Sequence, residues 1–156
     1  MAAKTWSRTV GDANWSTAGN WNGGTVPATT DTVTFDATSI LNCTIDALGT
    51  WSGGTFTVAS TYTGQITQSV AMVTAAFVMN GNNASAYTMS ANLTTTTFAI
   101  TTGVITFGFT ISTGAFQCTT FSVSSGYANL GGATTCLTTG AISFSTAAGT
   151  PSVAIT

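Results

Sequence analysis

The sequence of 156 residues contains very little charge and no histidine. Lys and Arg number 2 and Asp and Glu number 4, so charged residues make up 4% of the chain, against about 25% in an ordinary domain. Two cations cannot neutralise a phosphate backbone, which excludes a basic nucleic-acid-binding protein. The 44% share of hydrophobic residues excludes an acidic disordered tail, because such tails are poor in apolar side chains.

The usual catalytic and metal-binding groups are scarce as well. A Ser or Cys nucleophile needs an adjacent base, but the chain has no histidine and its one lysine is Lys4. All four carboxylates are aspartates, for which we expect turn and capping roles, not a glycosidase pair or a Ca²⁺ loop. No phosphate-binding glycine motif occurs. We therefore expect a protein that is not an enzyme and that binds no metal or cofactor.

Long hydrophobic runs are also missing. The most apolar stretch, residues 70–79, is about half as long as a membrane-spanning helix. Residues 1–15 lack the apolar segment of a secretory signal peptide. We therefore expect no membrane insertion, and synthesis in a host cytoplasm without an export signal.

Cysteine occurs three times, as Cys43, Cys118 and Cys136, without a CxxC pair. An odd number of cysteines with no histidine does not fit a zinc site. Free cysteine is among the most buried residue types, so we predict small core positions for all three. One disulfide and one free thiol is the alternative.

The few charges are confined to the first part of the chain, at Lys4, Arg8, Asp12, Asp31, Asp36 and Asp46. The surface of residues 47–156 must therefore be wetted by hydroxyls and amides, or be buried against other copies or a larger assembly. Ser and Thr supply these hydroxyls, because together they form roughly a third of the chain. Such a surface responds little to salt, since it carries no charges to screen.

Alternation of apolar and polar residues with a period of two runs along the chain and predicts β-strands. Residues 98–107, 109–118 and 121–130 share one template, in which apolar positions alternate on both sides of two small polar residues and a glycine. Gly and Asn tolerate positive φ, so we predict a tight turn at each position of this kind. These corner positions, spaced 11, 11, 11, 12 and 14 residues apart, are Gly81, Asn92, Gly103, Gly114, Gly126 and Gly140.

The repeat favours a single-domain, all-β parallel β-solenoid, in which two repeat units form a coil of about 22–23 residues. An antiparallel jelly roll or β-sandwich is the alternative, because the same corners could be hairpin turns. We prefer the solenoid because the arms are short and the corners are TTG, STG and SSG, not the Asn-Gly or Asp-Gly of hairpins. The predicted core positions, stacked like on like, are Phe98, Ile100, Ile105, Phe107, Phe109, Ile111, Phe116, Cys118, Phe121, Val123, Ala128, Leu130, Ile142 and Phe144.

Residues 1–40 differ from the repeats at 41–156 and predict an N-terminal cap. They contain the near-repeat ANWS/GNWN, the turn GGTVP and the charged strand DTVTFD. Large rings can cover the open end of a solenoid, and charges discourage pairing at its edge. We predict a packing or anchoring role at this end for Trp6, Arg8, Trp15 and Trp21. A sugar-stacking surface formed by the tryptophans is the alternative.

This W…NW…GG…P…D.V.F run resembles the opening of β-helical passenger and adhesin-like repeat proteins. The resemblance covers about thirty residues and implies an architecture, not an activity. It implies a right-handed β-solenoid of the kind found in surface and virion structural modules.

Together these observations predict a non-enzymatic structural protein of a virus particle, such as a phage capsid decoration protein, a head fibre or a spike-like module. We expect it in the virion, with itself as one partner and a capsid or similar assembly as the other, and with trimeric symmetry. The alternatives are a cell-surface adhesin or glycan-binding module at the extracellular surface, and a self-assembling fibre subunit.

Overall fold

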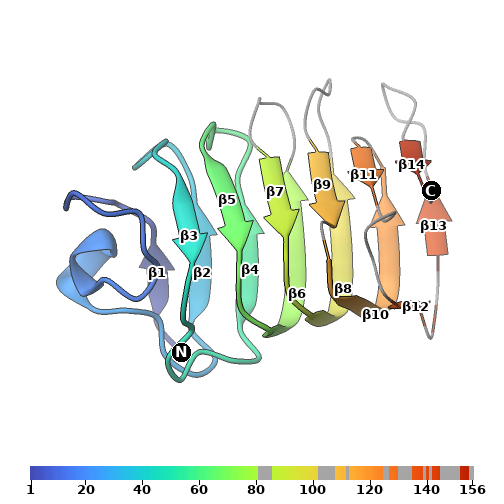
Figure 1. Cartoon of the computed structure of the whole chain (residues 1–156), viewed down its shortest axis with the longest axis horizontal. Coiled ribbons are helices and arrows are strands. Elements are labelled where there is room, and N and C mark those ends of the chain that lie inside the picture. Colours follow the sequence, from blue (N-terminus) through green and yellow to red (C-terminus); the bar gives the residue numbers. More distant parts are fainter. Residues whose placement is uncertain are drawn as a thin grey trace.

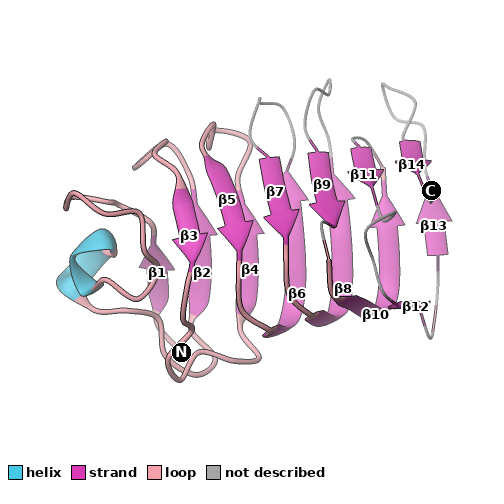
Figure 2. Cartoon of the chain, in the orientation of Figure 1, coloured by secondary structure: helices cyan, strands magenta, loops and turns pink. Residues whose placement is uncertain are grey.

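The computed structural model is a row of short β-strands stacked along one long axis, with the N-terminal segment at one end (Figure 1). Two short 3-10 helices, η1 (Ala18–Asn20) and η2 (Asn22–Gly24), lie at this end (Figure 2). No helix in the described part of the chain is long and apolar enough to cross a membrane. The structure describes residues 1–80, 86–101, 108–111, 113–124, 127–129, 135–138, 140, 142–144 and 152–154.

The strands form two sheets, and every ladder between the described strands is parallel. The first sheet consists of β1 (Ala3–Thr5), β2 (Thr32–Phe35), β4 (Thr55–Val58), β6 (Met72–Asn80), β8 (Leu93–Thr101), β10 (Ala115–Val123), β12 (Thr135–Thr138) and β13 (Ile142–Phe144). The second sheet consists of β3 (Cys43–Ile45), β5 (Gln65–Gln68), β7 (Ala86–Met89), β9 (Gly108–Ile111), β11 (Tyr127–Asn129) and β14 (Ser152–Ala154). The chain is therefore a parallel β-solenoid, as predicted, and not a jelly roll.

Equivalent residues of neighbouring coils lie at about the predicted spacing. Phe98 pairs with Phe77, 21 residues earlier, and with Phe121, 23 residues later. The first coil is longer, because Thr5 pairs with Thr34 across the cap segment. Strands β1 and β2 lie within residues 1–40, and β2 pairs with β4 of residues 41–156. Residues 1–40 therefore contribute strands to the same sheet as the repeats that follow.

The long strands β6, β8 and β10 each turn a corner that the sequence analysis did not predict. Along β6, Met72 and Thr74 are buried and the next buried residue is Phe77, so the alternation shifts phase at this point. The register between β6 and β8 omits Ala75 and its neighbour Thr96 at the same place. These corners carry alanine or threonine and no glycine, so the turn-residue pattern missed them.

The additional corners give the solenoid three faces. Face A contains β12 and the first halves of β6, β8 and β10, whereas face B contains β1, β2, β4, β13 and the second halves. Face C is the second sheet. Gly140 lies between β12 and β13, at the corner between faces A and B, where an added Cβ would lie 2.6 Å from Thr119 O. Its φ is not positive, so the prediction of a positive φ is wrong there, and close packing is what requires the glycine.

Asn92 and Gly114 lie at the corner between faces C and A. Gly114 has a φ of 107°, and a Cβ here would lie 2.7 Å from the carbonyl carbon of Ala91, so glycine is required. Asn92 does not have a positive φ, so the prediction is wrong for this residue. Its Oδ1 instead accepts a hydrogen bond from Ala115 N at 2.9 Å, which ties one coil to the next. The other predicted corners lie outside the described residues: Gly81, Gly103 and Gly126.

A stack of phenylalanine rings runs along the core. Centroids from Phe56 to Phe77, Phe98 and Phe121 are 5.0, 5.3 and 5.3 Å apart in turn, with interplanar angles of 5°, 9° and 7°. The predicted core positions whose side chains are described are all buried, namely Phe98, Ile100, Phe116, Cys118, Phe121 and Val123. The others lie outside the described side chains: Ile105, Phe107, Phe109, Ile111, Ala128, Leu130, Ile142 and Phe144.

The prediction of buried cysteines is confirmed for two of the three residues. Cys43 and Cys118 are both buried, with exposed fractions of 1% and 4%. Burial raises the pKa of the Cys43 thiol, which keeps it protonated and unreactive. The side chain of Cys136 lies outside the described side chains.

We expect Phe77→Ala to destabilise the chain by about 3–5 kcal/mol, because it leaves a cavity in the middle of the ring stack. The side chain of Val78, one residue further along β6, points outward. Val78→Thr should therefore change the free energy of unfolding by less than about 0.5 kcal/mol. Urea unfolding followed by tryptophan fluorescence measures both values. Equal, small effects would contradict a core that depends on this stack.

Candidate functional site

Four tryptophans form the interior of the capped end. Trp6 and Trp15 are fully buried, and Trp21 and Trp51 are 2% exposed. Trp21 packs edge-on against Trp6 and Trp15, with ring centroids 5.2 and 4.6 Å apart. Trp15 also lies 5.4 Å from Trp51 and is stacked 6.3 Å from Phe56. The tryptophan cluster therefore continues directly into the phenylalanine stack, and Trp51 is a member that the sequence analysis missed.

This burial leaves no tryptophan face for a sugar or a partner protein. The indole of Trp6 donates to Leu41 O at 3.0 Å, and that of Trp21 donates to Trp15 O at 2.7 Å. The rings therefore pack as a cap, and the sugar-stacking alternative has no surface on which to act. Of the predicted anchor residues, only Arg8 is partly exposed.

Arg8 fastens the N-terminal loop through main-chain carbonyls. Its Nε donates to Asp12 O at 2.9 Å, its Nη1 to Asn42 O at 3.3 Å and its Nη2 to Gly11 O at 3.4 Å. Arg8 also has a φ of 29°, an uncommon value for a residue with a side chain. Because Asn42 directly precedes β3, Arg8 ties the loop to the first strand of face C.

Asp12 organises the same loop as a hydrogen-bond acceptor. It accepts from Asn14 N at 3.0 Å, from Thr17 Oγ1 at 2.9 Å and from Asn20 Nδ2 at 2.8 Å. These bonds lower the pKa of Asp12. The bond from the Asn14 amide has the largest effect, and the bond from Thr17 has the next largest. Its role is therefore the turn and capping role predicted for the aspartates.

Asp31 and Asp46 fasten two further parts of the cap. Asp31 accepts from Ala2 N at 2.6 Å and from Ala28 N at 3.0 Å, and these bonds lower its pKa. Asp46 accepts from Ser16 N at 3.0 Å and from Ser16 Oγ at 2.5 Å. Burial opposes ionisation of Asp46, but the hydrogen bonds from Ser16 and from the main chain at Asp46 and Ala47 together outweigh it, and the pKa is lowered. No group of three His, Cys, Asp or Glu within the described residues could hold a metal ion.

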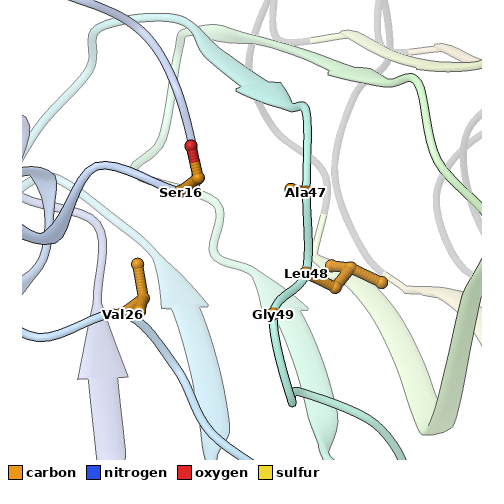
Figure 3. Close-up of a pocket in the computed structure, with 5 residues that line it drawn as sticks. All are labelled: Ser16, Val26, Ala47, Leu48 and Gly49. Carbon is orange, nitrogen blue, oxygen red and sulfur yellow. The ribbon is translucent and has the colours of Figure 1, made fainter.

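A hollow of about 130 Å³ lies beside the cap (Figure 3). Ser16 and Val26 line it from the N-terminal segment, and Ala47, Leu48 and Gly49 line it from the loop after β3. The polar groups of Ser16 are engaged by Asp46, so little remains in the hollow to orient a substrate. The hollow is a gap between two packed segments and offers no catalytic arrangement.

Beyond residue 46, the outer faces of the solenoid are uncharged and rich in hydroxyls. On face C, Thr44, Thr67 and Thr88 occupy the same register position on successive strands, so they repeat at about 4.7–4.9 Å. No Asp, Glu, Lys or Arg follows residue 46. Burying such a face against another protein therefore requires no desolvation of charge, which is otherwise a large cost. These faces are the candidate interaction surface.

The lowered pKa values of Asp12, Asp31 and Asp46 determine how the free energy of unfolding should depend on pH. A carboxylate with a lowered folded pKa adds stability that is complete above its ordinary pKa of 3.8. This stability is lost as the pH falls through the folded pKa values. With no histidine in the chain, we expect a constant free energy of unfolding between about pH 5 and 8.

Urea unfolding across a pH series measures this dependence. The triple variant Asp12→Asn, Asp31→Asn and Asp46→Asn should be less stable at neutral pH and lose less stability in acid. Thr57→Ala, which removes no titrating group, should keep the acid dependence of the unchanged chain. Identical pH profiles for the triple variant and the unchanged chain would contradict the assigned roles.

Comparison with family models, with curated proteins and with solved structures finds no significant match to this chain. What the chain does must therefore be argued from its own fold, its buried cap and its uncharged faces.

Proposed function

We propose that the protein is a non-enzymatic structural protein of a virus particle, such as a phage capsid decoration protein, a head fibre or a spike-like module. The observation that supports this most strongly is a solenoid whose faces carry no charge beyond residue 46, closed at one end by a buried tryptophan cap. Such faces suit permanent burial against neighbouring subunits, and obligate interfaces are the more apolar class of interface.

The construction of the core fits a mechanical role. Every coil is bonded to its neighbours by parallel ladders, and the aromatic rings pack from one coil to the next. Bending the solenoid would separate rings and break ladder hydrogen bonds together, so the module resists deformation. A rigid element of this kind holds a fixed position on the surface of a particle.

The two ends of the solenoid differ, which gives the module a direction. The charged side chains and the exposed part of Arg8 are at the capped end, whereas the strands beyond it carry only uncharged side chains. We assign the capped end to orienting the module on the particle. The uncharged faces mediate association between copies into a closed symmetric oligomer, and a trimer is the form that we propose.

Two measurements on the purified full chain test the proposal. Sedimentation measures self-association, and a binding assay measures attachment to capsids of its source. We expect a defined oligomer that persists at high salt, because its faces carry no charges for ions to screen. The double variant Thr67→Lys and Thr94→Lys adds charge to faces C and A, where both residues are exposed. It should dissociate the oligomer without lowering the melting temperature.

Ala18→Lys is the control for each of these lysines, because it adds one positive charge to an exposed position in η1 at the capped end. This variant should self-associate like the unchanged chain. A compact monomer that binds neither capsid nor filament would overturn the proposal, and so would turnover of a substrate by the purified chain.

A further inference from the structure

Asn22 and Gly23 form an exposed Asn-Gly pair in the turn that closes the cap. Both residues are exposed and belong to η2, outside every strand. Gly23 has a φ of 76°, and no atom lies within 4 Å of the position where its Cβ would be. Gly23 therefore places no side chain beside its own amide nitrogen, and no neighbouring atom fills the space where that side chain would lie.

We propose that this pair is a site of spontaneous modification, at which Asn22 converts to an aspartyl or isoaspartyl residue. The Gly23 nitrogen loses its proton and attacks Cγ of Asn22, a C–N bond forms, and the Cγ–Nδ2 bond breaks to release ammonia. Water then adds to one of the two carbonyls of the resulting ring and opens it. No oxidant, reductant or second protein is required. This inference does not depend on the proposed function.

The surroundings of Asn22 favour the reaction in the folded chain. Its Oδ1 accepts a hydrogen bond from Thr5 N at 2.6 Å, which polarises the carbonyl that is attacked. Ring closure also requires rotation of the main chain at the asparagine, and a turn outside the ladders allows this rotation more readily than a strand does.

The chain contains a second Asn-Gly pair, at Asn80 and Gly81, which serves as an internal comparison. Asn80 is the last residue of β6, is half-buried, and pairs with Thr101 in the ladder between β6 and β8. Its Oδ1 also accepts a hydrogen bond, from Thr101 Oγ1 at 2.6 Å, so both side-chain carbonyls are polarised and the two sites differ in the freedom of the main chain. The ladder holds the main chain of Asn80 extended, so the same local sequence should react more slowly there.

The modification would act on the contacts that close the cap. Next to Asn22, Trp21 forms an antiparallel bridge with Trp6, and their rings lie 5.2 Å apart. Lys4 also reaches across this turn to donate to Thr25 Oγ1. An isoaspartyl residue lengthens the main chain by one methylene at this point, so it would loosen β1 and the tryptophan packing over the first coil.

Incubation of the purified full chain in mildly alkaline buffer, followed by peptide mass mapping and isoaspartyl detection, tests the proposal. We expect conversion at Asn22 to be several-fold faster than at Asn80 in the folded chain, and to accelerate with pH because the attacking nitrogen must lose a proton. In denaturant the two sites should react at similar rates. Tryptophan fluorescence of the aged chain should shift towards that of exposed indoles.

Asn22→Gln should abolish conversion in this turn, because the longer side chain closes a less favourable ring, and Asn80→Gln should leave the rate at Asn22 unchanged. Equal rates at Asn22 and Asn80 in the folded chain would overturn the proposal. An intact Asn22 after other asparagines have converted would overturn it as well. Both outcomes can be observed on the unchanged chain, so the test does not depend on the folding of a variant.

Discussion

The parallel in-register ladder is the constraint on which the rest of this structure depends. It places equivalent residues of successive coils one strand spacing apart, about 4.7–4.9 Å, so each core side chain must pack against its own counterpart. Phe77 and Phe98 meet this requirement with nearly parallel rings, whereas Thr74 meets it with a hydrogen bond to Thr95 Oγ1 at 2.9 Å. The same spacing aligns the outer threonines into rows and makes the uncharged faces regular.

The ladder also explains why the charges are confined to the N-terminal segment. A buried or partly buried main-chain N–H needs an acceptor, and within the coils the neighbouring strand supplies one. In the cap the chain leaves the ladder, and the carboxylates of Asp12, Asp31 and Asp46 accept hydrogen bonds from main-chain N–H groups there. The aspartates therefore fasten loops where no strand can, and the later coils, held by strands, contain no carboxylate.

Several features could not be inferred from the repeat template. The corners at Ala75 and Thr96 require no positive φ and contain no glycine, so they carry no turn signature. Gln68 is fully buried at a register position that holds Ile45 in the preceding coil. Its Nε2 donates to Asn92 O at 2.9 Å, and its Oε1 accepts from Tyr87 Oη at 2.8 Å. These partners are far apart along the chain, so only the folded coils bring them together.

By itself, the sequence determined the all-β parallel solenoid, the coil length, the inward positions that are described, and the presence of a tryptophan-rich cap. These properties depend on residues close together in the chain, through the period of two and the recurring turn residues. Only the tertiary structure decided that the coils built on β6, β8 and β10 have three faces, that Trp51 completes the cap, and that the tryptophans are buried instead of forming a binding surface. Such properties depend on which coil lies against which, and they arise only when distant segments are stacked.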